Sequence, residues 1–170
     1  MSNMTLGRND GCKPFIRHTN FDIGLCKGTR IMTAEGNLPV EYLQAGDRIT
    51  TQKGTAELRH VASRMVPVIR PVLVRAGVLG QHRPTRDLVL GPDQRVYLPN
   101  WRARVRFGSD QASAPVSQLI DGEFIRQTEA SVKVQIYNLE FDTPQIIYAE
   151  GAEIMSATCP VQSAYIFAAE

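Results

Sequence analysis

The sequence predicts a mostly β fold. Short apolar runs recur along the chain, and turns that contain glycine separate them. Apolar and polar residues alternate along residues 131–141, which is the period of a β-strand. Within that segment we expect Val132, Val134 and Ile136 to share one face. No segment has the spacing of a long amphipathic helix, so a helical fold does not compete with this interpretation.

The first half of the chain is expected to hold two short strands, at residues 29–33 and 47–52. Residues 40–43 are predicted to form a helical turn between them. Glycine marks the turns, because it adopts the backbone conformations that reverse a strand without steric cost. The expected turns are Gly36–Asn37, Ala45–Gly46 and Lys53–Gly54.

The second half continues the pattern. Pro67 and Pro71 interrupt an apolar stretch, and proline cannot donate a ladder hydrogen bond, so this stretch is expected at a sheet edge or a bend. The remaining strands are predicted at residues 72–74, 87–90, 95–98, 131–141 and 146–148.

Length and composition agree with a single domain. A chain of 170 residues can bury a proper core, and 43% hydrophobic with 21% charged residues is ordinary for a globular protein. The net charge of +2 is too small to indicate nucleic-acid binding, and no apolar run is long enough to span a bilayer. The first ten residues lack the apolar segment of a conventional secretory signal, so we expect cytoplasmic synthesis, with non-classical export or assembly into a particle left open.

Cysteine and histidine give no sign of a metal site, a cofactor site or a disulfide framework. The spacing contains no C-x-x-C element, and the histidines are isolated from one another. His82 lies in an expected loop and is predicted to be exposed and not catalytic. The residues concerned are Cys12, Cys26, Cys159, His18, His60 and His82.

Several segments match a known pattern in order. Residues 24–31 are similar to Cys-x-x-x-Gly-Thr-x-Ile except at the first position, and residues 36–49 are similar to G-x-x-P-V-E-x-L-x-x-G-D-x-V. Residues 75–80 and 86–96 follow, the latter similar to D-L-x-V-S-P-x-H-R-V, and residues 134–151 are similar to a closing pair of strands. Together these segments resemble a Hedgehog/intein (Hint) self-processing domain of the bacterial branch.

The resemblance implies a compact β horseshoe with pseudo-two-fold symmetry. It implies a Hint-like domain at residues 24–156, preceded by an N-terminal extension at 1–23 and followed by a C-terminal tail at 157–170. Neither terminal segment is explained by the resemblance. We expect these two segments to contact other protein subunits or to pack back on their own domain.

The resemblance also places the catalytic positions, and this chain differs at them. In the family the leading Cys attacks the peptide bond before it, and here Gly24 stands in that place. A Ser or Thr and, three residues later, a His are replaced by Gly91 and Gln94. The closing Asp-x-His becomes Asp142 and Pro144 with Thr between them, so of these groups only the carboxylate persists.

These losses predict that self-cleavage is gone. An N-to-S acyl shift needs a thiol held against the preceding carbonyl and a group that protonates the departing nitrogen. Glycine has no thiol, and the amide of Gln94 cannot titrate. The sequence therefore predicts a degenerate domain kept as a structural or interaction module, in a larger secreted or particle-like assembly, and no functional catalytic residue.

Cys26 offers an alternative. It lies two residues after Gly24 and would share its side of an extended segment, so it could act as a shifted nucleophile on the Leu25–Cys26 bond. Asp142 would then be an electrostatic partner, and Gln94 would orient the carbonyl. The simpler interpretation is that Cys26 is a small buried apolar residue.

A third function class is suggested by residues 101–107. Trp101 is followed by arginines that alternate with apolar residues, which on a strand gives a basic face opposite a core face. A carbohydrate- or nucleic-acid-binding β module would use such a face. A solvated strand face is the simpler interpretation, because the remaining charges do not extend it into a patch.

Overall fold

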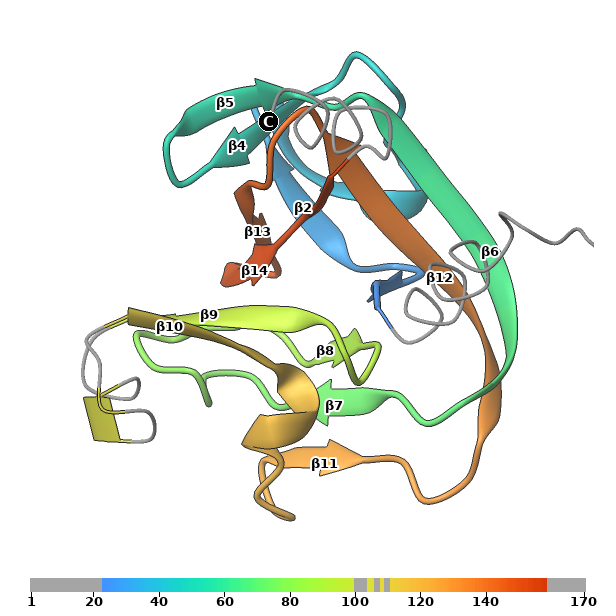
Figure 1. The fold of residues 1–170 in the computed structure, drawn as a ribbon, viewed down its shortest axis with the longest axis vertical. Helices are drawn as coiled ribbons and strands as arrows, with labels where there is room; N and C mark the ends of the chain where they lie inside the picture. The colour runs from blue at the N-terminus through green and yellow to red at the C-terminus, as the bar shows by residue number, and fades with distance from the viewer. Residues whose placement is uncertain (1–22, 100–103, 106–107, 109–110, 159–170) are drawn as a thin grey trace, which may run out of the picture.

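The computed structural model describes residues 23–99, 104–105, 108 and 111–158. Two long strands, β6 (His60–Ile69) and β12 (Val132–Phe141), run side by side along one edge of the molecule (Figure 1). The other strands gather in two groups, one at each end of this ribbon, so that the outline is a horseshoe. The predicted mostly β fold is confirmed.

One sheet is built around β12. Its order is β11, β7, β8, β1, β12 and β15, and β6 pairs with β12 outside this order. All pairings are antiparallel except that between β12 and β15. The shorter strands are β1 (Leu25–Cys26), β7 (Val72–Val74), β8 (Leu88–Leu90), β11 (Ile125–Gln127) and β15 (Ala157–Thr158).

The second sheet runs in the order β10, β9, β14, β13, β2, β4 and β5, and β3 pairs with β2. Its first strands are β2 (Arg30–Thr33), β3 (Gly36–Pro39), β4 (Arg48–Thr51) and β5 (Gly54–Glu57). Its later strands are β9 (Arg95–Pro99), β10 (Gln111–Pro115), β13 (Ile146–Ala149) and β14 (Ala152–Met155). Two 3₁₀ turns follow strands of this sheet, η2 (Val40–Tyr42) and η3 (Val116–Leu119).

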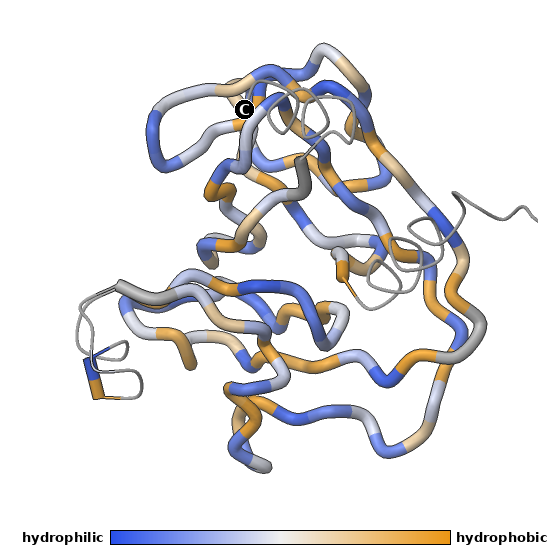
Figure 2. The backbone as a smooth tube through the Cα atoms, in the orientation of Figure 1, coloured by the Kyte–Doolittle hydropathy of each residue, from blue (hydrophilic) through white to orange (hydrophobic). Residues whose placement is uncertain are grey.

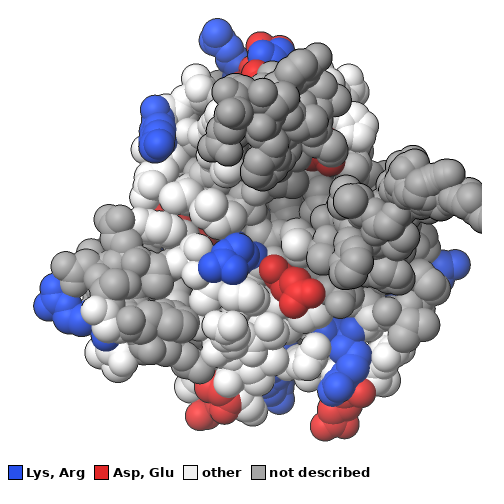
Figure 3. Space-filling model, viewed as in Figure 1, with Lys and Arg blue, Asp and Glu red and all other residues white. Residues whose placement is uncertain are grey.

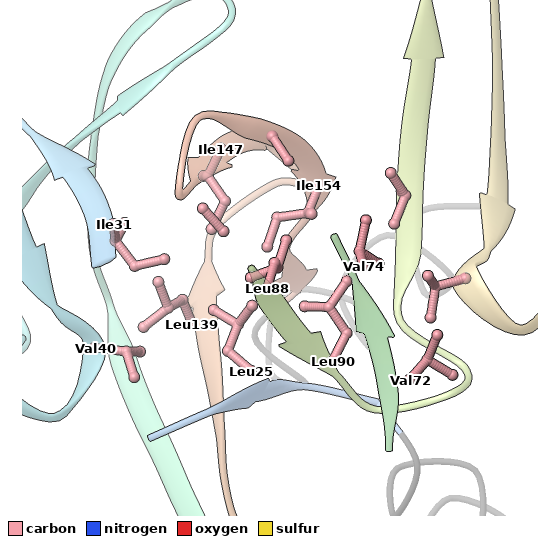
Figure 4. Packing of buried hydrophobic residues seen from close by; sticks show 14 of the residues in the cluster. Leu25, Ile31, Val40, Val72, Val74, Leu88, Leu90, Leu139, Ile147 and Ile154 are labelled. Atoms are coloured by element: carbon pink, nitrogen blue, oxygen red, sulfur yellow. The ribbon is translucent and has the colours of Figure 1, made fainter. Parts of the chain in front are cut away.

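The main core lies where the two sheets meet. Leu25, Leu90 and Leu139 from the first sheet belong to one buried cluster with Ile147 and Ile154 from the second (Figure 4). Each is at most 2% exposed, and burial of such a side chain stabilises the fold by about 1.5–3 kcal/mol. Hydrophilic residues mark the tip of the β4–β5 hairpin (Figure 2). The buried residues of the main core come from strands that are far apart in the sequence, and their packing holds the two sheets together.

Most predicted elements are present, with ends shifted by one or two residues. The strands expected at 29–33, 47–52, 72–74, 87–90, 95–98, 131–141 and 146–148 correspond to β2, β4, β7, β8, β9, β12 and β13. The helical turn is η2. Strand β6 continues through Pro67 and pairs only with β12 among the described strands, which confirms the expected edge position.

The turn predicted at Gly36–Asn37 is wrong, because both residues belong to β3. The chain reverses two residues earlier, at Ala34 and Glu35. Thr33 closes that turn: its hydroxyl accepts a hydrogen bond from the Glu35 N–H (3.1 Å) and donates one to the Gly36 carbonyl (2.7 Å). A threonine at the end of the first strand sets this turn, and the glycine begins the next strand.

The structure differs from two further expectations. Val134 and Ile136 pack in one cluster, but Val132 is 40% exposed, because the pairing with β6 shifts register between Val132 and Val134. In the segment 101–107, Arg104 and Val105 are helical and Val105 is 80% exposed, so the expected strand with a core face is wrong there. Trp101 and the other residues of that segment lie outside the described residues.

Candidate functional site

Gly24 immediately precedes β1, the strand that lies between β8 and β12 in the first sheet. Leu25 pairs with Tyr137 on one side and with Leu90 on the other, which sets Gly24 opposite Asn138. The Gly24 carbonyl accepts a hydrogen bond from the Gly91 N–H at 3.0 Å. The structure thus brings together two of the positions that the resemblance identifies.

The backbone at Gly24 leaves no room for a side chain. Its φ is +142°, a conformation that side chains rarely adopt. A Cβ there would lie 2.2 Å from Ile136 Cγ2, 2.9 Å from Asn138 Oδ1 and 2.9 Å from the Tyr137 carbonyl oxygen. Neighbouring atoms thus occupy the space that a thiol-bearing side chain would need. This crowding depends on the pairing of β1 with β12, which the sequence does not display.

Gln94 is a structural amide in this setting. The turn from Gly91 to Gln94 is closed by a hydrogen bond from the Gln94 N–H to the Gly91 carbonyl (3.0 Å). The side chain is buried and donates hydrogen bonds to the Met155 carbonyl (2.7 Å) and to the Arg95 carbonyl (3.2 Å). Its donors are therefore used to join β9 to the end of β14.

Little space remains between these groups. Leu25, Gln94, Asn138 and Ser156 are among the residues around a cavity of about 10 Å³. That volume is the lower limit for one water molecule. Sequence reasoning missed Asn138 and Ser156. Asn138 stands out in the sequence as a polar residue inside an apolar strand, but this pattern does not indicate which residue the Asn138 side chain contacts.

Asp142 and Pro144 lie apart from Gly24 and Gly91. Asp142 follows the end of β12, and its carboxylate accepts from the Arg59 guanidinium at 2.9 Å on the surface. It is four residues beyond Asn138, or about 13 Å along a strand. Pro144 is exposed. The carbonyl of the next residue, Gln145, accepts from the Ser156 N–H, and the Gln145 N–H donates to the Ser156 hydroxyl oxygen, which connects this segment to the cavity.

Cys26 is buried in apolar surroundings. It is 8% exposed and packs with Val66, Ile69 and Ile136. Burial raises the pKa of its thiol to about 11. At pH 7 such a thiol is ionised to only about one part in 10⁴, and the thiolate is the nucleophilic form.

Glu150, which the sequence did not single out, has a buried carboxylate that joins β2 to the segment before β8. Glu150 accepts from the Arg30 N–H (2.9 Å) and from both Nε and Nη2 of Arg86 (3.3 and 3.0 Å). Its own carbonyl accepts from the Thr85 N–H at 2.7 Å. Glu150 and Gly151 both have positive φ and form the two-residue turn between β13 and β14. Only the turn had a signal in the sequence.

The other ionisable groups of the described residues form no metal centre. Among the described residues no group of three or more His, Cys, Asp and Glu side chains could hold a metal ion. His82 is exposed, as predicted. On the face shown in Figure 3, Lys and Arg are interspersed with Asp and Glu among the described residues, and neither sign forms a patch there. No helix in the described part is long and apolar enough to cross a membrane.

Comparisons with known proteins agree with this architecture. A family model for the Hint domain matches residues 23–159. The bacterial intein-like domain from Clostridium thermocellum is similar in structure, with 13% identity and a TM-score of 0.51 over 80% of this chain and 99% of that one. A variant of the gp41-1 intein gives 12% identity and a TM-score of 0.50 over 80% and 99%. At such identities the likeness concerns the fold. No curated protein matches significantly.

Proposed function

This chain belongs to the Hint domain family, and from that premise we propose that it is a member that does not cleave peptide bonds and that serves as a structural or interaction module. The fold supplies a scaffold, while function depends on particular sites. The groups that would carry out the reaction are replaced at Gly24, Gly91, Gln94 and Pro144. Asp142 keeps a carboxylate, which the Arg59 guanidinium engages on the surface.

The crowding at Gly24 carries this proposal. A missing thiol alone would leave an empty place in an otherwise competent centre. Here Ile136 and Asn138 fill the position where a Cβ would stand. The departure from the reactive arrangement therefore includes the backbone and the packing as well as one side chain.

Two observations support the same proposal. Gln94 directs its amide donors at the Met155 and Arg95 carbonyls, so they are not turned toward the bond before Gly24. The cavity beside it has room for about one water molecule. General acid–base catalysis contributes typically about 10²–10⁴-fold, and an amide cannot supply it.

Cleavage by Cys26 is the rival. Its sulfur lies in an apolar cluster, where burial raises the pKa of the thiol to about 11. A catalytic cysteine depends on the opposite shift, produced by a nearby cation, imidazole or helix N-terminus. The environment of Cys26 therefore favours the structural interpretation.

Intact-mass spectrometry tests the proposal. Freshly purified full chain is incubated with and without dithiothreitol or hydroxylamine, beside the Cys26→Ala variant. We expect one species at 18.9 kDa in every sample. Fragments 1–25 and 26–170 that disappear in Cys26→Ala would establish the rival. Fragments 1–23 and 24–170 would show cleavage at the family position and would overturn the proposal as well.

The module role concerns the terminal segments. The match to the family covers residues 23–159, and the N-terminal extension at 1–23 and the C-terminal tail at 157–170 lie largely outside that range. We propose that these segments make contacts with other protein subunits or within the chain, in a larger secreted or particle-like assembly. Native mass spectrometry of the full chain over a range of concentrations tests the contacts between subunits: concentration-dependent oligomers support them, and a monomer throughout removes them.

A further inference from the structure

A second apolar cluster lies outside the main core. We call it the outer cluster: Cys26, Val66, Ile69 and Ile136, with Val89 and Val134 against them. Its members come from β1, β6, β8 and β12, which all belong to one sheet. Their sequence neighbours Leu25, Leu88 and Leu90 belong to the main core, and Tyr137, next to Ile136, packs against it. Because adjacent side chains of a strand point to opposite faces, the outer cluster lies on the face of the sheet turned away from that core.

The burial of the outer cluster needs a covering layer. Ile136, Val66 and Ile69 are 1%, 2% and 3% exposed. Neighbours in one sheet shield one another only at their sides, so a face with no second layer stays open to water. Met65, on the opposite face of the same ribbon, is 48% exposed. None of the six members comes from outside this sheet, so the cover is not supplied by the cluster itself.

We infer that residues 1–22 dock on the outer cluster and act as an intramolecular ligand of this domain. The segment joins the described chain at Ile23, three residues before Cys26. Phe21 lies five residues before Cys26 and can reach up to about 17 Å from it. Ile136 pairs with Cys26, and Val66 and Ile69 follow along the ribbon, within about 15 Å.

The composition of the segment suits this face. Its last eight residues contain Phe15, Ile16 and Phe21, which are the large apolar side chains that an apolar cluster can bury. The C-terminal segment leaves the described chain at Thr158, which pairs with Phe141. That point is five residues along β12 from Ile136, or about 17 Å away. Residues 1–22 therefore have the nearer attachment.

Gly24 takes part in this arrangement. The Ile136 side chain that excludes a Cβ at Gly24 is the most deeply buried member of the outer cluster. The inference rests on the proposed loss of cleavage, because a domain that cut before Gly24 would free the segment as a separate peptide. The absence of a side chain at Gly24 and the retention of residues 1–22 on the domain would then both follow from the packing of Ile136.

Photo-crosslinking of the full chain identifies what covers the cluster. The photoreactive residue p-benzoylphenylalanine is incorporated at Val89, which is only partly buried and borders the cluster. A mixture of ¹⁴N and ¹⁵N protein distinguishes links within a chain from links between chains. We expect a link within one chain to a peptide from residues 1–22. A link to residues 159–170, a link between two chains, or none to 1–22 would overturn the inference.

A second measurement follows the thiol. N-ethylmaleimide labelling of Cys26 is timed by peptide mass spectrometry in the full chain and in Phe21→Asp. Tyr42→Asp is the matched control, because Tyr42 lies in the η2 turn and is 69% exposed. We expect labelling at least about tenfold faster in Phe21→Asp and unchanged in Tyr42→Asp. Equal rates in all three would contradict docking. Intact masses from the same samples report cleavage, so failure of the proposed function is seen separately.

Discussion

Two regions of the molecule join segments that are far apart in the sequence, and they do so in different ways. The junction consists of Arg30, Thr85, Arg86 and Glu150, and its buried carboxylate is fully paired. The centre consists of Gly24, Gly91, Gln94, Ile136 and Asn138, and uses backbone, amide and apolar contacts. The junction needs its charge, whereas the centre is packed without any ionisable group.

The difference separates what holds this fold from what a reaction would need. Removing a buried, hydrogen-bonded carboxylate leaves the groups that it satisfies without partners, which is costly. Removing a thiol and an imidazole from a reaction centre costs the fold little if neighbouring atoms close the space. A Hint domain can therefore lose its chemistry and keep its architecture. Single substitutions at the junction and at the centre can measure this difference.

The largest effect is expected from Gly24→Ala. The new methyl group meets Ile136 and Asn138 and also holds an unfavourable φ, so we expect a loss of about 3–5 kcal/mol in the free energy of unfolding. Gly36→Ala is the matched control: its φ is +117° and nothing lies within 4 Å of the added Cβ. It should lose only about 1–2 kcal/mol. Urea denaturation gives both values, and equal losses would mean that the centre is open. Gly24→Cys should likewise yield no cleaved product.

The next largest effect is expected at the junction. Glu150→Leu removes the acceptor of the Arg30 N–H and of the Arg86 guanidinium, and we expect a loss of about 2–4 kcal/mol. Glu150→Gln keeps an acceptor oxygen and should lose less. Glu57→Gln is the exposed control, because Glu57 pairs with Arg59 on the surface, and it should change stability by less than about 1 kcal/mol. If Glu150→Leu behaves like Glu57→Gln, the junction does not differ from a surface ion pair.

A smaller effect is expected from Gln94→Leu. The variant removes the donors to the Met155 and Arg95 carbonyls but keeps an apolar side chain of similar size, so a loss of about 1–2 kcal/mol is expected. Gln94→His tests the reaction side of the contrast, because it restores an imidazole without a thiol. Intact mass should show no cleavage in either variant. Cleavage in Gln94→His would show that the centre retains reactive geometry.

Local signals explain how much of this could be predicted from the sequence. Most strands and the η2 turn follow from short-range patterns, and the resemblance identified the family. Glu150 could not be matched to its partners, because Arg86 and Arg30 lie 64 and 120 residues away. The crowding at Gly24 depends on the register of β1, a strand of two residues that is too short to show a period. Contacts set by register and by long-range packing therefore cannot be predicted from local sequence patterns.

The smallest effect is expected at Asp121, which tests whether burial makes the junction strong. Its exposed carboxylate accepts from the N–H groups of Ile125, Glu123 and Phe124 at 2.8–2.9 Å. The hydrogen bond from Ile125, with those from Glu123 and Phe124, lowers the pKa of Asp121 below its usual value. A lowered pKa in the folded state means that the ionised form adds stability above the unfolded pKa of about 3.9, and that this stability is lost as pH falls through the folded pKa.

Asp121→Asn should therefore be less stable than the natural chain at pH 6, by no more than about 1 kcal/mol because the group is exposed. The difference should shrink below about pH 4 and vanish once Asp121 is protonated in the folded state, since both chains then carry a neutral group. Urea denaturation at pH 6, 4 and 3 measures it. A difference that equals the Glu150→Leu loss would show that the number of hydrogen bonds matters and their burial does not. A difference that does not change with pH would show that the charge of Asp121 does not contribute to stability.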